Sequence, residues 1–218
     1  MVNNIIYSPS KLLPLKLDRS VRAQGATPTV LSTMNPTNKL VILDRDGVIN
    51  YDSDEYVKTI DEWIPLPGSI EALGKLTKAG YTIAIATNQS GIARQYFSVE
   101  TLTAMHKKMV DLATLAGAKI DYIAYCPHGP DDQCDCRKPL PGLIHQIESA
   151  LSVSAAGCFM VGDSLRDLQA GQAAGLKVAL LLTGKGQKTL DKGLGLDDVS
   201  IFNDLNAFVE QLINQDTD

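Results

Sequence analysis

The chain has 218 residues and a formal net charge of −5, a length that suits one α/β domain with a sizeable core. Its mild acidity argues against a nucleic-acid-binding protein, because phosphate backbones attract basic surfaces. No apolar run reaches the roughly 18 residues of a membrane-spanning helix, and the first residues lack the pattern of a secretory signal. We therefore expect a cytoplasmic monomer that binds neither nucleic acid nor membrane.

Residues 1–37 carry little regular pattern. Ser, Thr, Asn and Pro recur there among scattered leucines, which predicts a poorly ordered N-terminal extension. One short packed piece between Ile5 and Leu17 is an alternative. A separate hypothesis is that translation starts at Met34, because a regular pattern begins only at Lys39; the intact mass of the native protein would test it. Residues 38–218 are expected to form the single domain.

From Lys39 onward, short apolar runs alternate with segments of helical periodicity. In chain order, the expected elements are a strand at 40–43, a helix at 69–79, a strand at 81–86, a helix at 99–116, a strand at 120–125, a helix at 142–151, a strand at 158–161, a helix at 165–174, strands at 177–182 and 199–201, and a helix at 205–213. Continuous apolar strands that alternate with helices predict a doubly wound, Rossmann-like parallel sheet with helices on both faces.

Polar side chains follow the strands of this sheet. Asp44 and Asp46 come directly after the first strand, and Thr87 follows the second. Lys138 follows the third strand after a longer loop, and Asp163 follows the fourth. Because open parallel sheets bind ligands beyond the carboxyl ends of their strands, we expect these side chains to share one site.

This set of side chains suits phosphoryl transfer. The Asp44 carboxylate can attack phosphorus, and Asp46 can protonate the leaving oxygen and later take a proton from water. Two like charges about 4 Å apart repel by about 4 kcal/mol at an effective dielectric near 20, so Asp163 beside them calls for a cation. Mg²⁺ prefers such oxygen ligands. Asp-x-Asp-Gly alone is often only a turn, and Gly-Asp-Ser is often only a helix N-cap. The evidence for a catalytic site is the placement of all these motifs together at strand ends.

Four segments together resemble the motifs of the haloacid dehalogenase superfamily: Asp44-x-Asp46-Gly47, Thr87, Lys138 and Gly162-Asp163…Asp167. The resemblance covers most of the chain. It implies that Asp44 is the nucleophile, that Asp46 is the general acid and base, and that Thr87 and Lys138 stabilise the phosphoryl group. It also implies Mg²⁺ bound by Asp44, by the main-chain carbonyl of Asp46 and by Asp163. The second aspartate indicates a phosphatase rather than a dehalogenase.

A cysteine cluster precedes Lys138. Three thiols and one imidazole form the closed ligand set of a structural zinc site: Cys126, His128, Cys134 and Cys136. Free thiols with an exposed histidine, or a disulfide, are the alternatives, and Cys158 is interpreted as a core residue. Zinc would order the loop that leads directly into Arg137 and Lys138.

Neither 46–67 nor 125–141 leaves room for a helical cap domain, so we expect an open, capless site. A capless site with a zinc loop resembles the subfamily of heptose-bisphosphate and histidinol-phosphate phosphatases, and residues 87–94 and 134–139 are more similar to the heptose type. That resemblance implies removal of the 7-phosphate of D-glycero-D-manno-heptose 1,7-bisphosphate, on the route to ADP- or GDP-heptose and lipopolysaccharide. The substrate-binding residues that it and the strand ends suggest are Asp52, Asp54, Glu55, Asn88, Gln89, Ser90, Arg137 and Lys138.

Other functions remain open at this point. Hydrolysis of histidinol phosphate or of another small phosphomonoester uses the same chemistry. A zinc-stabilised binding module would be expected to have lost the nucleophile, and Asp44 is present. A polynucleotide end phosphatase would need a basic groove, which the acidic composition disfavours. The helical histidines His106 and His145 are interpreted as surface or packing residues.

Overall fold

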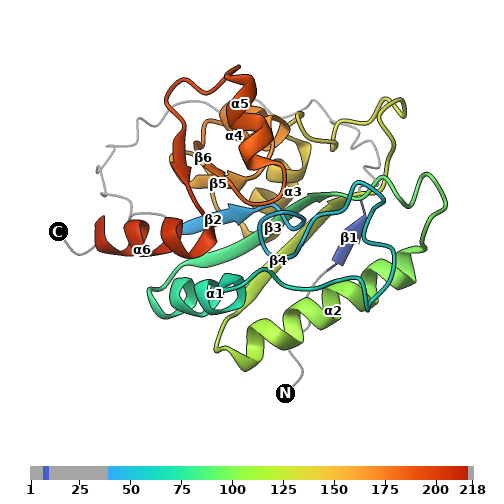
Figure 1. The fold of residues 1–218 in the computed structure, drawn as a ribbon, viewed down its shortest axis with the longest axis horizontal. Coiled ribbons are helices and arrows are strands. Elements are labelled where there is room, and N and C mark those ends of the chain that lie inside the picture. Colours follow the sequence, from blue (N-terminus) through green and yellow to red (C-terminus); the bar gives the residue numbers. More distant parts are fainter. Residues whose placement is uncertain (1–6, 10–38, 216–218) are drawn as a thin grey trace, which may run out of the picture.

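The computed structural model describes residues 7–9 and 39–215. Most of the expected extension at 1–37, including Met34 and the alternative packed piece apart from Tyr7–Pro9, therefore lies outside the described residues. The described chain forms one parallel sheet in the order β1-β4-β3-β2-β5-β6-β7 (Figure 1). Its strands are β1 (Tyr7–Pro9), β2 (Leu40–Leu43), β3 (Thr82–Asn88), β4 (Ile120–Cys126), β5 (Phe159–Gly162), β6 (Lys177–Leu181) and β7 (Ser200–Phe202).

The central strand β2 fixes the position of the first polar segment. All four residues of β2 are buried, and it pairs in parallel with β3 on one side and β5 on the other. Leu43 lies opposite Ile85 and Val161 in the two neighbours. The N–H of Asp44 still donates to the Val161 carbonyl at 2.9 Å. The Asp44 side chain therefore begins at the carboxyl edge of the sheet, in its middle.

Helices cover both faces of the sheet, as the strand pattern predicted (Figure 1). The helices are α1 (Ser69–Lys78), α2 (Val99–Leu115), α3 (Gly142–Leu151), α4 (Leu165–Ala173), α5 (Gly186–Lys192) and α6 (Leu205–Gln215). One buried core includes Leu73 of α1, Met105 of α2 and Phe208 of α6. The other includes Ile144 of α3 and Leu168 of α4. The two apolar layers hold the sheet between them and leave its carboxyl edge for polar residues.

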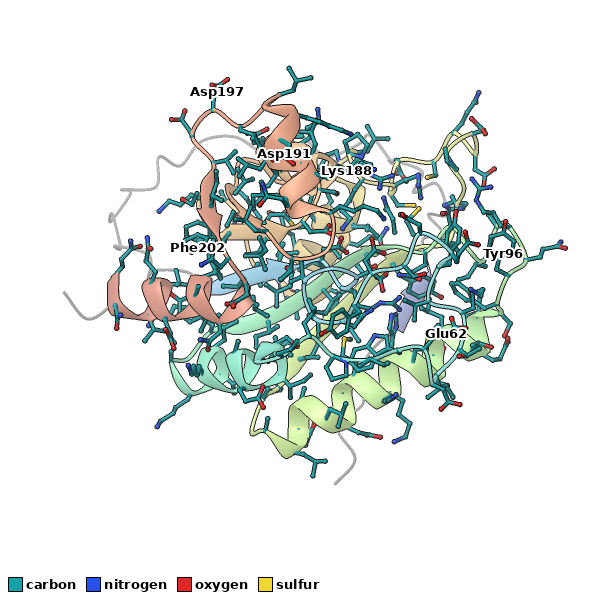
Figure 2. The ribbon with its side chains drawn as sticks, viewed as in Figure 1. Glu62, Tyr96, Lys188, Asp191, Asp197 and Phe202 are labelled. Carbon is teal, nitrogen blue, oxygen red and sulfur yellow. The ribbon has the colours of Figure 1, made fainter. Side chains whose placement is uncertain are left out.

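The far end of the sheet is closed by aromatic packing. Phe202 in β7, labelled in Figure 2, lies 5.3 Å from Phe208, centroid to centroid, and Phe159 in β5 lies 5.3 Å from the same ring. Both pairs are edge-to-face, an arrangement that aromatic rings favour. These contacts fasten α6 across β5 and β7.

The predicted strands and helices from residue 40 onward are confirmed, with ends shifted by at most two residues. Two elements were not predicted. The first is helix α5, which buries only Gly186 and Thr189 and therefore lacks an apolar stripe. The second is strand β1, in the N-terminal segment that shows little regular pattern. Segments 44–68 and 127–141 contain no helix, and the site is capless over the described residues. None of the described helices has the length and apolarity to cross a bilayer.

Candidate active site

Lys138 is the central cation of the site. Its Nζ lies 2.9 Å from Asp44 Oδ1 and 2.6 Å from Asp167 Oδ1, and it donates to the Ala86 carbonyl at 2.6 Å. The side chain is 2% exposed. Burial alone would lower the pKa of Lys138, but the carboxylates of Asp167 and Asp44 raise it above its ordinary value. The lysine is therefore a permanent positive charge beside the Asp44 carboxylate.

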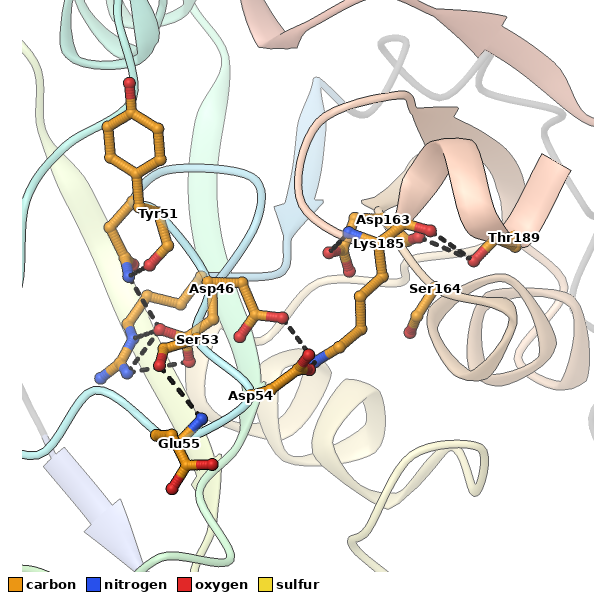
Figure 3. A network of polar contacts seen from close by, with 12 residues as sticks. Asp46, Tyr51, Ser53, Asp54, Glu55, Asp163, Ser164, Lys185 and Thr189 are labelled. Carbon is orange, nitrogen blue, oxygen red and sulfur yellow. Dashed lines mark hydrogen bonds and ion pairs between the residues drawn. The ribbon is translucent and has the colours of Figure 1, made fainter. Parts of the chain in front are cut away.

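Asp163 is enclosed by two glycine-containing loops. A Cβ at Gly47 would lie 2.1 Å from Asp163 Oδ2, and one at Gly184 would lie 2.2 Å from it; both residues also have positive φ angles. The same oxygen accepts the Lys185 N–H at 2.7 Å, and Thr189 Oγ1 donates to the Asp163 carbonyl at 3.0 Å (Figure 3). The loop after β6 thus holds Asp163 in place.

Three carboxylates, of which two are buried and that of Asp44 is half-buried, form a set that fits a hard divalent cation. Oxygens of Asp44, Asp163 and Asp167 all lie within 4.8 Å of one another. Burial, with repulsion from Asp167, raises the pKa of Asp44 to about 7 and that of Asp163 to about 8. Asp167 itself is engaged by Lys138 and by Ser164, whose N–H and Oγ donate at 3.0 and 2.6 Å. Asp44 and Asp163 are therefore the side chains that would hold Mg²⁺.

These pKa shifts predict how magnesium stabilises the protein. The folded-state pKa values of Asp44 and Asp163 lie above the ordinary 3.8, so the metal-free protein loses stability as pH rises toward 8. Mg²⁺ binds the ionised carboxylates. We expect the Mg²⁺-dependent rise in Tm to be at least about 4 °C larger at about pH 8 than at about pH 5.5. Thermal unfolding with and without Mg²⁺ measures this, and equal rises at both pH values would contradict it.

Asp46 is held by a separate group of donors. Arg45 Nη2 lies 2.8 Å from both of its carboxylate oxygens, Asn50 Nδ2 donates to Oδ1 at 2.8 Å, and Gln89 Nε2 donates to Oδ2 at 2.8 Å. Burial would raise the pKa of Asp46, but the Arg45 charge and these hydrogen bonds lower it below its ordinary value. Asp46 is therefore a carboxylate in this structure.

The end of β3 contributes the residues that were expected to meet phosphate. Thr87 is fully buried, and its Oγ1 accepts a hydrogen bond from Gln89 Nε2 at 2.8 Å. Asn88 forms two hydrogen bonds with the Lys138 backbone. Asn88 Nδ2 donates to the Lys138 carbonyl at 3.0 Å, and the Lys138 N–H donates to Asn88 Oδ1 at 3.1 Å. The side chains of Asn88 and Gln89 therefore support Lys138 and Asp46, while Ser90 lines the pocket beside them.

One pocket of about 200 Å³ brings the predicted residues together. It is lined by residues that the sequence predicted for the site: Asp44, Asp46, Asp52, Asp54, Thr87, Asn88, Gln89, Ser90, Arg137, Lys138, Asp163 and Asp167. Glu55 differs, because its N–H donates to Ser53 Oγ at 3.1 Å in a turn and its side chain is exposed to solvent outside the pocket. The structure thus places Glu55 outside the pocket lining, and its contact with substrate stays a prediction.

Several pocket residues were not predicted. Lys185 Nζ lies 2.5 Å from Asp52 Oδ2 and 3.8 Å from Asp54 Oδ1, so it joins the loop after β6 to the loop after β2 (Figure 3). Its place after a predicted strand was a usable signal. Tyr56 also lines the pocket and packs edge-to-face against Tyr96, at 5.1 Å between ring centroids. The remaining additions are Ser53, Val57, Ser164 and Arg166.

The cysteine cluster has the geometry of a four-ligand metal site. Cys126 Sγ lies 3.2 Å from Cys136 Sγ, 3.8 Å from Cys134 Sγ and 3.7 Å from His128 Nδ1. Donor atoms at the corners of a tetrahedron around zinc, with Zn–S bonds of about 2.3 Å, lie at similar separations. All four cysteines are free of disulfides. The arrangement fits zinc, with His128 binding through Nδ1, and excludes the disulfide alternative.

Known proteins resemble the chain in sequence. A family model described as haloacid dehalogenase-like hydrolase matches residues 22–175. Proteins named D-glycero-beta-D-manno-heptose-1,7-bisphosphate 7-phosphatase from Pseudomonas putida and from Neisseria meningitidis serogroup B are each 52% identical, over 175 and 181 residues. The alignments cover 80% and 82% of this chain, and 99% and 97% of the two relatives. The match to these relatives thus spans nearly their whole length.

Solved structures resemble the chain in fold as well as in sequence. The crystal structure of D,D-heptose 1,7-bisphosphate phosphatase from B. bronchiseptica, in complex with magnesium and phosphate, has a TM-score of 0.79 and 51% identity, covering 81% of this chain and 99% of that one. The corresponding enzyme from Burkholderia thailandensis has a TM-score of 0.64 and 42% identity, covering 80% and 98%. Sequence, fold and site geometry agree, and the chain belongs to the haloacid dehalogenase-like hydrolase family.

Proposed function

We propose that this chain is a magnesium-dependent phosphatase that removes the 7-phosphate of D-glycero-D-manno-heptose 1,7-bisphosphate. The observation that carries the proposal is the Asp44 carboxylate, 2.9 Å from the buried Lys138 ammonium in a pocket that Asp46 and Asp163 also line. The names of the relatives support the heptose substrate. The pocket has no cap over it, which suits a substrate with a second phosphate outside the reacting centre.

Asp44 is the nucleophile of the first step. Its carboxylate oxygen bonds to phosphorus, the bond from phosphorus to the sugar oxygen breaks, and that oxygen takes a proton from Asp46. Lys138 and the Thr87 hydroxyl stabilise the charge that develops on the phosphoryl oxygens. Mg²⁺, held by Asp44, Asp163 and the main-chain carbonyl of Asp46, would neutralise the carboxylates and the phosphate when bound.

The second step returns the enzyme to its starting form. Water attacks the aspartyl-phosphate, Asp46 accepts a proton from that water, and inorganic phosphate leaves Asp44. The donors around Asp46 lower its pKa in the substrate-free site, so Asp46 must take up a proton as substrate binds; it donates that proton in the first step and enters the second step as the carboxylate that this step requires. We infer that the same side chain alternates between acid and base in successive steps.

Arg137 is proposed to bind the distal phosphate. Its guanidinium lines the pocket and donates to the His128 carbonyl at 3.2 Å, so the zinc loop supports it. Hydrogen bonds to charged groups contribute roughly 1.5–3 kcal/mol. We therefore expect Arg137→Met to raise KM for the bisphosphate by about 10- to 100-fold, and to leave KM for a heptose 7-monophosphate within about threefold. Steady-state kinetics on both substrates measure this, and equal changes would contradict the assignment.

We further propose that the Cys126–Cys136 loop holds a structural zinc ion and that the protein is a cytoplasmic monomer. Four protein ligands leave no open position for catalysis at such a site. The absence of a disulfide among the four cysteines, all in the described part of the chain, supports a reducing compartment.

Turnover tests the proposal directly. Mg²⁺-dependent release of phosphate is compared for heptose 1,7-bisphosphate and histidinol phosphate at equal concentration. The proposal predicts that kcat/KM for the heptose substrate exceeds that for histidinol phosphate by at least about 100-fold, since a built pocket discriminates through its polar contacts. A preference for histidinol phosphate would assign the chain to the other type within the same subfamily.

A further inference from the structure

A buried polar chain extends from Asp46 away from the pocket. Arg45 contacts Asp46 through Nη2 and Nε, at 2.8 and 3.2 Å, and its Nη1 lies 3.3 Å from His106 Nε2 in helix α2. Arg45 is 1% exposed and His106 is 0% exposed. Neither residue lines the pocket. The guanidinium thus lies between the carboxylate of the site and a histidine behind it.

His106 is a neutral acceptor in this contact. Arginine is always cationic and can only donate, so Nε2 of the imidazole carries the lone pair and Nδ1 carries the proton. Burial, together with the Arg45 charge, lowers the pKa of His106 to about 3, which keeps the ring uncharged. The ring also packs edge-to-face against Tyr125 of β4, at 6.1 Å between centroids. Its position is therefore fixed by both α2 and the sheet.

We propose that His106 is a positioning residue for the phosphatase reaction, because it fixes the Arg45 guanidinium that orients the Asp46 carboxyl group. A buried guanidinium with an unsatisfied N–H pays a desolvation penalty and shifts toward other acceptors. Such a shift would rotate the two contacts with Asp46. His106 therefore acts on the reacting proton through Arg45, without touching substrate itself. The inference rests on the proposed role of Asp46 as general acid, and not on heptose as the substrate.

The role has a kinetic consequence that depends on the leaving group. A sugar alkoxide must receive the Asp46 proton as its bond to phosphorus breaks. A nitrophenolate leaves readily without one. Misplacement of Asp46 therefore slows formation of the aspartyl-phosphate from alkyl phosphates far more than from aryl phosphates. The ratio of kcat/KM for the two substrate types reports on Asp46, because kcat/KM covers the steps up to the first irreversible one.

The test compares His106→Gln, His106→Asn and His106→Leu, each as full-length protein loaded with Mg²⁺ and zinc. The Gln amide oxygen reaches the place of Nε2, the shorter Asn oxygen ends near the place of Nδ1, and Leu has no acceptor. We expect Leu and Asn to lower kcat/KM for an alkyl phosphate by about 10- to 100-fold and for p-nitrophenyl phosphate by less than about threefold. His106→Gln is expected to retain most of both activities. His145→Leu, the same change on the exposed face of α3, is the matched control.

The outcomes separate this inference from the proposed function. If wild type hydrolyses alkyl phosphates but Leu and Asn slow both substrates equally, or if Gln is as impaired as Asn on the alkyl phosphate, His106 is only structural and the inference is wrong. If the Leu variant does not fold, the Gln and Asn pair still decides. If wild type hydrolyses no phosphomonoester with Mg²⁺, the proposed function fails and this inference with it.

Discussion

Asp44→Asn is expected to lower Mg²⁺-dependent phosphate release by more than about 10⁴-fold. An amide has nearly the same shape as the carboxylate but cannot form the bond to phosphorus. It also removes one negative charge from the set that would hold Mg²⁺ with Asp163. Phosphate release at saturating substrate and Mg²⁺ measures the loss. Asp111→Asn, on the exposed face of α2, is the control that keeps full activity.

The stability of the Asp44→Asn variant separates lost chemistry from unfolding. Burial raises the pKa of Asp44 to about 7, so its ionised form is unfavourable in the metal-free fold near pH 8. Lys138 keeps its contact with Asp167, at 2.6 Å. The variant should therefore unfold at the same or a higher temperature than metal-free wild type at that pH. An active variant, or an inactive one that is unfolded, would each contradict Asp44 as nucleophile in a preformed site.

Cys134→Ser is expected to lose zinc, to lower turnover by about 10- to 100-fold, and to lower Tm. The loop from Cys126 to Cys136 runs directly into Lys138, so its order sets where the lysine lies relative to Asp44. The loss is partial rather than complete, because Asn88 also holds the Lys138 backbone through two hydrogen bonds. Metal content by mass spectrometry, turnover at saturating Mg²⁺ and thermal unfolding are measured on the same preparation.

Cys158→Ser serves as the control for this prediction. Cys158 is buried beside β5 and lies outside the ligand cluster. Its replacement should cost stability through an added buried hydroxyl, yet leave the zinc content at one ion per chain. Full turnover by Cys134→Ser without zinc would show that the loop positions Lys138 without the metal.

The fold and the side chains at the centre of the site were predictable because the carboxyl ends of parallel strands meet at one edge of the sheet. Asp44, Thr87, Lys138 and Asp163 each follow an apolar run, and a parallel sheet places such positions at one edge. Lys185 follows the same rule and could have been included. Glu55 lies outside the pocket because adjacent loop residues can point either way, and its exposed side chain could not be placed from the sequence.

The buried contacts of Arg45 and His106 behind these side chains were not predictable. Arg45 sits between two catalytic candidates, but nothing in its neighbours indicates a buried guanidinium. His106 has the helical spacing of a surface or a core residue, and its partner lies 61 positions away in sequence. Such contacts depend on how α2 packs against the sheet. The local sequence pattern does not indicate how α2 packs against the sheet. A single histidine in a predicted helix could therefore only be interpreted as a surface or packing residue.

Lys185 joins two parts of the site that differ in purpose. Its main-chain N–H holds the carboxylate of Asp163, and its side chain holds Asp52, on the loop after β2 that is predicted to contact substrate. A loop redesigned to accept another sugar would change the contacts of the same residue that fixes Asp163, the proposed metal ligand. Attempts to change the specificity of this enzyme by varying residues 52–56 should therefore be accompanied by variation at 185, since substrate choice and metal affinity would otherwise drift together.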